Sequence, residues 1–226
     1  PIEVEKVTIL QDSCGPGKWR GGPGLEKTFK TVSSNRMILS YCCDRERSVP
    51  LGVFGGGPGV PHGVHLNPGT PQERYLGVAF SGYRLQDGDQ VWRPSSGGGG
   101  YGDPMERDPQ KVLEDVIDGY VSLERARADY GVVIRPVDPE IDAYEIDEPA
   151  TGRERQNIRE MRLSWLETDP EEVSRQVQAG KITPLDAIRR HGVILDRTTQ
   201  QVLPNTTRVF RQTLRERCAP YWKRTS

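Results

Sequence analysis

The sequence is poor in cysteine, in aromatic residues and in long apolar runs. Four cysteines in 226 residues exclude the dense disulfide framework of a small secreted domain. Apolar runs such as residues 37–39 are far shorter than the roughly 18 residues that a membrane span needs. No basic segment followed by an apolar stretch opens the chain, so a secretory signal is absent or already removed. These absences predict a cytoplasmic protein without a membrane partner.

An excess of charge of one sign is also lacking. The 31 lysines and arginines nearly cancel the 32 aspartates and glutamates. Because no overall field attracts polyanions, nucleic acid is disfavoured as a main partner. The length of 226 residues fits one large domain or two small ones. The chain begins with Pro1 rather than Met, and we therefore expect it to be a processed piece or the ordered part of something longer.

Glycine and proline are abundant, and they divide the sequence into two halves. Of the 43 residues of these two types, 31 fall within residues 1–110. The short alternating or β-branched runs between them predict strands joined by turns and wide loops. The predicted strands are residues 2–10, 25–32, 36–43, 73–80 and 90–92. The first half is therefore predicted to be rich in β-structure.

Four glycine-rich loops stand out in this half, at residues 14–24, 55–63, 67–71 and 95–104. Ordering so much glycine costs conformational entropy. Such loops persist where the backbone must adopt a positive φ or come close to another chain or a ligand. We therefore expect these loops to pack tightly against something outside themselves, as one share of a larger catalyst.

The second half contains an internal repeat, because residues 108–134 return as residues 169–195, 61 residues later. In each copy an aspartate followed by proline predicts the start of a helix, and a glycine predicts its end. A serine or threonine then caps a second short helix, which a further glycine ends. The paired signals are Asp108 and Asp169, Gly119 and Gly180, Ser122 and Thr183, and Gly131 and Gly192. Each copy thus predicts a helical hairpin.

These patterns predict an α+β fold, a glycine-rich β region followed by small helical-hairpin repeats. The β region takes residues 1–107, and the first hairpin takes residues 108–137. Residues 138–168 hold an acidic linker and a helix from 153 to 167, and residues 169–226 hold the second hairpin and a basic tail. The cations of this tail are expected to form a solvated face or to dock an acidic partner subunit: Arg208, Arg211, Arg215, Arg217, Lys223 and Arg224.

The first glycine-rich loop is the candidate anion-binding site, with Gly15, Gly17, Lys18 and Arg20 as its members. Two cations beside several backbone N–H groups could form a nest for a phosphate or a carboxylate. In the alternative interpretation, Trp19 packs down onto the protein, while the two cations stay in solvent or pair with acidic neighbours. The sequence leaves both interpretations open.

Two patterns in the glycine-rich loops match nucleotide-binding motifs only in part. The spacing Gly97-x-Gly99-x-x-Gly102 fits the dinucleotide pattern, but Asp103-Pro104 interrupts entry into a helix. Gly17-Lys18 is followed by Trp rather than by Ser or Thr, so it is no phosphate loop. The chain alone is therefore expected to bind neither ATP nor another cofactor.

The histidines and cysteines give weaker candidates. His62 and His65 lie three apart in a Pro/Gly-rich loop, but no cysteine or carboxylate stands beside them at a spacing that would complete a metal site. We expect polar loop residues there rather than metal ligands. Cys14 shares its loop with two cations, which would allow a lowered thiol pKa, yet no base is evident beside it. The other cysteines and His191 are interpreted as structural.

The order of the motifs is more specific than any one of them. Residues 11–24, 52–59 and 66–69 are followed by 97–104, which runs into Arg107-Asp-Pro and ends in Tyr130-Gly-Val-Val. In this order they resemble the C-terminal portion of the large subunit of the hydantoinase B/oxoprolinase family, with its N-methylhydantoinases, oxoprolinases and acetone or acetophenone carboxylases. The resemblance covers residues 1 to about 137, and the second repeat is similar to longer members. Cys14 departs from it, because the family more often carries glycine there.

The resemblance implies a subunit that works with a hydantoinase A-type subunit and with the upstream part of the same large subunit. Related carboxylases also have a small third subunit. Complexes of this family use ATP with Mg or Mn to hydrolyse a cyclic amide such as hydantoin, oxoproline or another lactam, or to carboxylate a ketone. Phosphorylating a substrate oxygen creates a good leaving group, and cationic, N–H-rich loops stabilise the phosphorylated intermediate.

The resemblance assigns no reacting residue to this chain, because the metal-binding His and Asp of related carboxylases lie in an earlier part of the large subunit. ATP and its metal ion are expected to be bound mainly by other chains or by upstream segments. The chain alone is therefore predicted to be inactive, with Lys18 and Arg20 lining the shared cavity. The alternative, from a different class, is a non-catalytic structural module that clamps partner subunits.

Overall fold

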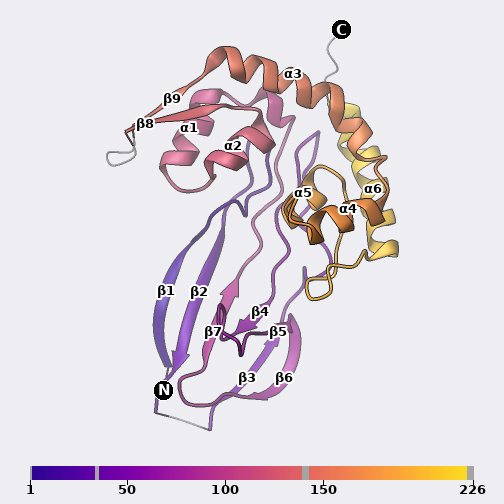
Figure 1. Ribbon diagram of the computed structural model, residues 1–226. Coiled ribbons are helices and arrows are strands. Elements are labelled where there is room, and N and C mark those ends of the chain that lie inside the picture. Colours follow the sequence, from indigo (N-terminus) through magenta and orange to yellow (C-terminus); the bar gives the residue numbers. More distant parts are fainter. Residues whose placement is uncertain (1, 34–35, 139–142, 223–226) are drawn as a thin grey trace.

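The computed structural model describes residues 2–33, 36–138 and 143–222, and Figure 1 shows their arrangement. The first half forms the strands in the lower part of Figure 1: β1 (Ile2–Leu10), β2 (Gly24–Thr31), β3 (Ile38–Cys42), β4 (Val64–Leu66), β5 (Arg74–Gly77), β6 (Ala79–Arg84) and β7 (Gln90–Pro94). Five of them form an antiparallel sheet in the order β1-β2-β7-β4-β5. Strands β3 and β6 form a second, two-stranded sheet.

A small hydrophobic core lies between these two sheets. Val64, Leu66 and Val91 are buried on one face of the five-stranded sheet, because alternate residues of a strand share a face. Tyr41 and Phe80 of the two-stranded sheet pack against this core. The two sheets thus form the two layers of a small sandwich.

The second half is helical, apart from a hairpin of β8 (Ile134–Asp138) and β9 (Ala143–Ile146). Its helices are α1 (Pro109–Ile117), α2 (Leu123–Tyr130), α3 (Glu148–Trp165), α4 (Pro170–Gln178), α5 (Pro184–Arg189) and α6 (Pro204–Arg217), with the short 3-10 helices η1 (Pro104–Glu106) and η3 (Ala219–Tyr221). The predicted α+β fold class is confirmed. In the described ranges, no helix combines the length and the apolar character needed to cross a membrane.

The internal repeat is confirmed together with its helix caps. Asp108 has φ −53° and ψ 124°, and Asp169 has φ −54° and ψ 123°. Each of these side chains accepts a hydrogen bond from the backbone N–H two residues on. After the second helix of each copy the chain turns at Gly131 or Gly192, with φ 63° and 61°. Local capping rules therefore account for both hairpins.

A third helix completes each copy of the repeat, α3 in the first and α6 in the second. Nε of Arg155 in α3 donates to the carbonyl oxygen of Tyr130 at 3.0 Å. Nε of Arg211 in α6 donates to the carbonyl oxygen of His191 at 2.9 Å, and His191 is the residue equivalent to Tyr130. Each arginine thus satisfies a carbonyl at the end of the preceding hairpin. The repeated unit is three helices, whereas the sequence pattern predicts only two.

Some strand boundaries differ from the sequence prediction. The strand predicted at residues 73–80 is wrong, because the chain leaves one sheet and enters the other there. Gly77, with φ 81°, ends β5, and β6 then pairs with β3 instead of β4. Strand β4 was not predicted, because its three residues lie between two glycine-rich loops and are too few to show a period.

The second half shows two further differences. The helix predicted from residue 153 already begins at Glu148, because the Asp147 side chain accepts a hydrogen bond from Ala150 N at 3.0 Å and caps it there. The strand-like run predicted after the second hairpin forms an isolated bridge between Leu195 and Val202 rather than a strand.

Candidate functional site

Three glycine-rich segments run side by side between the strands and the helices, and we call them the glycine-loop stack (residues 12–24, 50–60 and 95–103). Backbone hydrogen bonds join them: Gly15 N to Gly98 O at 2.7 Å, Gly57 N to Pro16 O at 2.6 Å, and Gly100 N to Gly57 O at 2.9 Å. The three segments therefore support one another, although they contain few side chains.

The segments approach one another too closely for side chains. A Cβ atom on Gly99 would lie closer than 3.0 Å to the carbonyl oxygen of Leu51, and one on Gly100 would lie as close to that of Pro16. Glycine is therefore required there by backbone contact within the chain. Packing of these loops against each other accounts for their glycines, and the expectation that they also pack against something outside themselves stays a prediction.

An arginine from the second helical repeat holds two of the three segments. Arg189 of α5 donates to the carbonyl oxygens of Asp12 at 2.8 Å and Cys14 at 2.7 Å, and to that of Pro58 at 3.3 Å. Its Nη1 also lies 2.5 Å from Oδ2 of Asp129 in α2, and both side chains are buried. The planar guanidinium has several donors in a fixed fork, so one residue joins the stack to both repeats.

A second anchor joins the candidate anion loop to α1. Arg20 Nε lies 2.6 Å from Oδ1 of Asp115, and Arg107 Nη2 lies 2.7 Å from Oδ2 of the same carboxylate. The Arg20 guanidinium also lies 4.2 Å from the ring centroid of Tyr120. Burial by itself would lower the pKa of Arg20, but the hydrogen bond and the charge of Asp115 outweigh burial and raise it. Arg20 is therefore charged and engaged within the protein.

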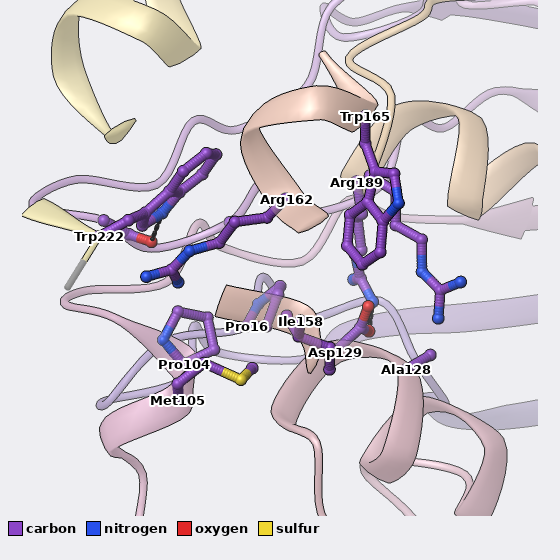
Figure 2. Close-up of a pocket in the computed structure, with 13 residues that line it drawn as sticks. Pro16, Pro104, Met105, Ala128, Asp129, Ile158, Arg162, Trp165, Arg189 and Trp222 are labelled. Carbon is purple, nitrogen blue, oxygen red and sulfur yellow. Dashed lines mark hydrogen bonds and ion pairs between the residues drawn. The ribbon is translucent and has the colours of Figure 1, made fainter. Parts of the chain in front are cut away.

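Figure 2 shows a cavity at the junction of the stack and the helices. Its volume is about 70 Å³, and Trp165, Trp222 and Arg162 are among its lining residues. Arg162 of α3 donates to both carboxylate oxygens of Asp103, at 2.8 and 2.9 Å. Small-molecule sites measure roughly 300–1,000 Å³, so this cavity suits a few water molecules and not a cyclic amide. The cavity therefore lies where the glycine-loop stack contacts the helices, beside the Arg162–Asp103 ion pair.

Lys18 lies at the surface of the stack. Half of its side chain is exposed, and its Nζ lies 3.6 Å from Oε2 of Glu106. The neighbouring Trp19 is 65% exposed, so the expectation that Trp19 packs down onto the protein is wrong. The pairing of the cations with acidic neighbours is observed for both Lys18 and Arg20.

The backbone of the candidate anion loop is largely engaged in the stack. The N–H groups of Gly15, Lys18, Trp19 and Gly21 all donate to backbone carbonyl oxygens. A Cβ on Gly17 would lie closer than 3.0 Å to the backbone of Tyr101. An anion at this loop would therefore meet chiefly the Lys18 ammonium rather than a ring of N–H groups.

The dinucleotide-like pattern of residues 97–102 also belongs to the stack. The segment that follows it is the three-residue 3-10 helix η1. A dinucleotide fingerprint places its pyrophosphate at the N-terminus of an α-helix, which η1 does not provide.

Cys14 does not have the properties of a nucleophile. It is only 2% exposed and packs against Val112, Val121 and Tyr130. Burial raises the pKa of its thiol, despite an opposing effect of the Arg189 charge. The lowered pKa considered from the sequence is therefore wrong, and Cys14 is a small core residue.

The two candidate metal-ligating histidines have different surroundings. His62 is buried, and burial lowers its pKa. His65 lies between the rings of Tyr75 and Trp92, with centroid distances of 5.0 and 4.9 Å, and its Nδ1 is 3.2 Å from Oε1 of Glu73. No group of three or more His, Cys, Asp or Glu side chains in the described part of the chain is placed to hold a metal ion.

Sequence reasoning missed the charged residues that hold the stack. Asp103 and Arg107 lie inside the segments that carry the family resemblance, so their place in those motifs was an available signal. Asp115, Asp129 and Arg189 lie on the repeat helices, where charged residues usually face solvent. Only the spatial contact between distant helices gives these residues a structural role.

Comparison with known proteins agrees with the motifs. A family model described as Hydantoinase B/oxoprolinase matches residues 1–104. The putative D-/L-hydantoinase B-type subunit of Pseudomonas sp. (strain NS671) is 30% identical over 156 residues, which cover 69% of this chain and 25% of that protein. The chain spans about a quarter of the length of the curated relatives it matches.

Two solved structures share the fold. The nucleotide-free structure of acetone carboxylase, an enzyme of ATP-dependent acetone carboxylation, has a TM-score of 0.63 at 19% identity and covers 98% of this chain and 32% of its own. The ATP-dependent caprolactamase from Pseudomonas jessenii has a TM-score of 0.58 at 28% identity, covering 69% of this chain and 26% of its own. Together with the ordered glycine-rich motifs, the family model and the hydantoinase relative show that residues 1–104 of this chain belong to the hydantoinase B/oxoprolinase family.

Proposed function

We propose that this chain is the C-terminal part of a hydantoinase B-type subunit in a multi-subunit, ATP-dependent enzyme. The enzyme hydrolyses a cyclic amide or carboxylates a ketone. The observation that carries the proposal is the match of residues 1–104 to the hydantoinase B/oxoprolinase model. The similarity to a hydantoinase subunit and to an ATP-dependent caprolactamase favours amide hydrolysis, while the fold shared with acetone carboxylase keeps carboxylation as the other reaction.

The remaining partners follow from the same proposal. We expect the upstream part of the B-type subunit and a hydantoinase A-type subunit in the complex, with a small third subunit if the reaction is carboxylation. Relatives named as subunits support a complex of several chains. Because the reaction uses ATP, we place the complex in the cytosol.

The described residues of this chain do not fit ATP and its metal ion. In these ranges no cluster of carboxylate, imidazole or thiolate groups is placed to hold Mg or Mn. The glycine-loop stack uses its N–H groups internally and leads into a 3-10 helix. We therefore assign ATP and the metal ion to other chains or to upstream segments, and we expect this chain alone to be inactive.

Lys18 is our candidate for contact with an anionic group of the substrate or intermediate. Half of its side chain is accessible, and the stack fixes its backbone because Lys18 N donates to Gly102 O at 3.2 Å. An ammonium held on rigid backbone stabilises negative charge with little reorganisation. Arg20 fixes the same loop to α1 through its ion pair with Asp115.

A structural role as a clamp for partner subunits is the second candidate, and one observation favours it. Five half-exposed apolar side chains meet at the tips of the glycine-rich segments and of η3, and we call them the loop-tip cluster: Trp19, Val53, Phe54, Tyr101 and Tyr221. Phe54 adopts φ 52°, a conformation that aromatic residues rarely take. Exposed aromatic residues on a rigid support are typical of protein interfaces.

Purification of the assembled complex tests the proposal. We expect the chain to copurify with an A-type subunit and ATP turnover to depend on one of hydantoin, 5-oxoproline, caprolactam or acetone with bicarbonate. The isolated 226-residue chain should show no turnover with any of them. Substrate-dependent ATP turnover by the isolated chain, or a native complex without an A-type subunit, would contradict the proposal.

A further inference from the structure

Strand β1 has an exposed apolar face at the edge of the five-stranded sheet. Among the described residues it pairs only with β2, and residues 2–8 are all exposed. Ile2 and Val4 are each 50% exposed, and Val7 is 61% exposed. A nine-residue edge strand with apolar side chains in water is a template for pairing with another strand.

The strand register shows that this apolar face continues the core face of the sheet. Val4 lies opposite Phe29 of β2, and Phe29 lies opposite Val91 of β7, which is buried in the core between the sheets. Directly opposite residues of neighbouring strands share a face. Beyond the bulge in β1, Ile9 lies opposite Leu25, which is 54% exposed. One face thus runs from the buried core outward to β1. In β1 this face is apolar, while Lys27 of β2, opposite Val7, and Arg93 of β7, opposite Lys27, add two cations to it.

The second layer of the sandwich covers only part of this face. Strands β3 and β6 pack over the core residues of β4 and β7, and Figure 1 shows β1 at the side of the molecule away from them. A sheet with one apolar face is stable when a second layer buries that face. The layer that would cover β1 is therefore supplied by polypeptide other than the described part of this chain.

We infer that β1 and its apolar face receive β-strands from the rest of the hydantoinase B-type polypeptide. These strands extend the two-stranded sheet over β1 and pair with its open edge. Two observations identify the polypeptide that occupies this surface. The geometry requires an extended backbone with an apolar side, and the family relatives are much longer than this chain. This chain matches only 25% of the length of the hydantoinase relative and 23% of that of the caprolactamase beta subunit, so such proteins contain the polypeptide needed. The inference rests on the proposed function for the identity of this polypeptide.

Photo-cross-linking in the purified complex tests this inference. Val7→p-benzoylphenylalanine places the reactive group on the apolar face, and Thr8→p-benzoylphenylalanine places it on the opposite face one residue away. We expect the group at position 7 to cross-link to upstream B-type polypeptide, identified by peptide mass, with a yield at least tenfold above that from position 8. Cross-links from position 7 to an A-type subunit or to a second copy of the chain would overturn the inference, as would the absence of cross-links.

Hydrogen exchange gives a second, independent measurement. We expect the β1 amides to exchange at least tenfold more slowly in the complex than in the isolated 226-residue chain, because new strand pairing protects them. Equal exchange in both samples would overturn the inference. Substrate-dependent ATP turnover is measured on the same complex, so loss of the proposed function and loss of this docking surface give different results.

Discussion

Arg125 and Asp186 occupy equivalent positions in the two copies of the helical repeat, and their side chains form a buried ion pair. Nη1 of Arg125 lies 2.9 Å from Oδ1 of Asp186, and Nη2 of Arg125 lies 3.0 Å from Oγ1 of Thr183. Equivalent positions meet in this way when two similar units pack around a local twofold axis. The two repeats therefore form one body, from which Arg189 reaches the glycine-loop stack.

Removing one partner of this pair should destabilise the chain strongly. In Arg125→Met, Asp186 loses the closer of its two cationic partners and keeps Arg190, whose Nε lies 3.5 Å from its Oδ1. We expect a loss of about 3 kcal/mol in the free energy of unfolding. Urea denaturation measures it. The double variant Arg125→Met/Asp186→Asn should recover a large part of the loss, because the buried carboxylate is removed as well. Equal stability of Arg125→Met and the parent would contradict the assignment.

The same carboxylate makes stability depend on acid pH. Burial by itself would raise the pKa of Asp186, but hydrogen bonds from Arg125 and Thr183 outweigh it and lower the pKa from 3.8 to about 2. A lowered folded-state pKa stabilises the fold above the unfolded value, and this contribution is lost as the pH falls toward about 2. Comparing urea denaturation of parent and Asp186→Asn between about pH 5 and about pH 2, we expect their difference to shrink by about 2 kcal/mol. A constant difference would argue against this pKa.

Two adjacent glycines give a matched test of the glycine-loop stack. A Cβ on Gly21 would lie closer than 3.0 Å to Gly98 O, whereas one on Gly22 would meet nothing within 4 Å. We expect Gly21→Ala to cost roughly 2–4 kcal/mol in the free energy of unfolding and Gly22→Ala to stay within about 0.5 kcal/mol. Chemical denaturation of both variants decides this. Similar stabilities for the two would show that the segments are not in backbone contact.

The cysteines should differ in reactivity according to their burial. Cys42 and Cys43 are exposed, whereas Cys14 and Cys218 are buried, and burial raises the pKa of both buried thiols. Because the thiolate is the reactive form, we expect iodoacetamide to label the exposed pair at least tenfold faster in the folded chain. Peptide mass mapping over time measures these rates. Labelling of Cys14 as fast as Cys42 would show that its loop is open.

The sequence predicted those helix ends that depend on residues directly beside them in the chain. The helix caps at Asp108 and Asp169 depend on an oxygen and on a proline directly beside them, so both hairpins could be located. The third helices could not be recognised as part of the repeat. The connection that leads to them forms a β-hairpin in the first copy and an isolated bridge in the second, so the regular spacing is lost. Arg155 and Arg211 become equivalent only through their contacts.

Long-range contacts were the part that the sequence did not reveal. The glycine content showed that the loops need close approach, but not that Gly99 approaches Leu51 of the same chain. Lys18 and Arg20 are two residues apart and look alike in sequence, yet a buried carboxylate from α1 engages Arg20, while the Lys18 side chain is half exposed. The candidate site is therefore reduced by structure to a single accessible cation on a rigid loop.

The assignment of Lys18 is tested most directly by ATP turnover of the assembled complex carrying Lys18→Ala. We expect substrate-dependent turnover to fall at least tenfold while subunit composition stays unchanged, with Lys18→Arg retaining a part of the activity because a cation remains. The variant Trp19→Ser separates the two candidate roles, since it alters the loop-tip cluster that would clamp partner subunits and leaves the Lys18 charge in place. Unchanged turnover in Lys18→Ala, or loss of the complex instead of turnover, would contradict the proposed role.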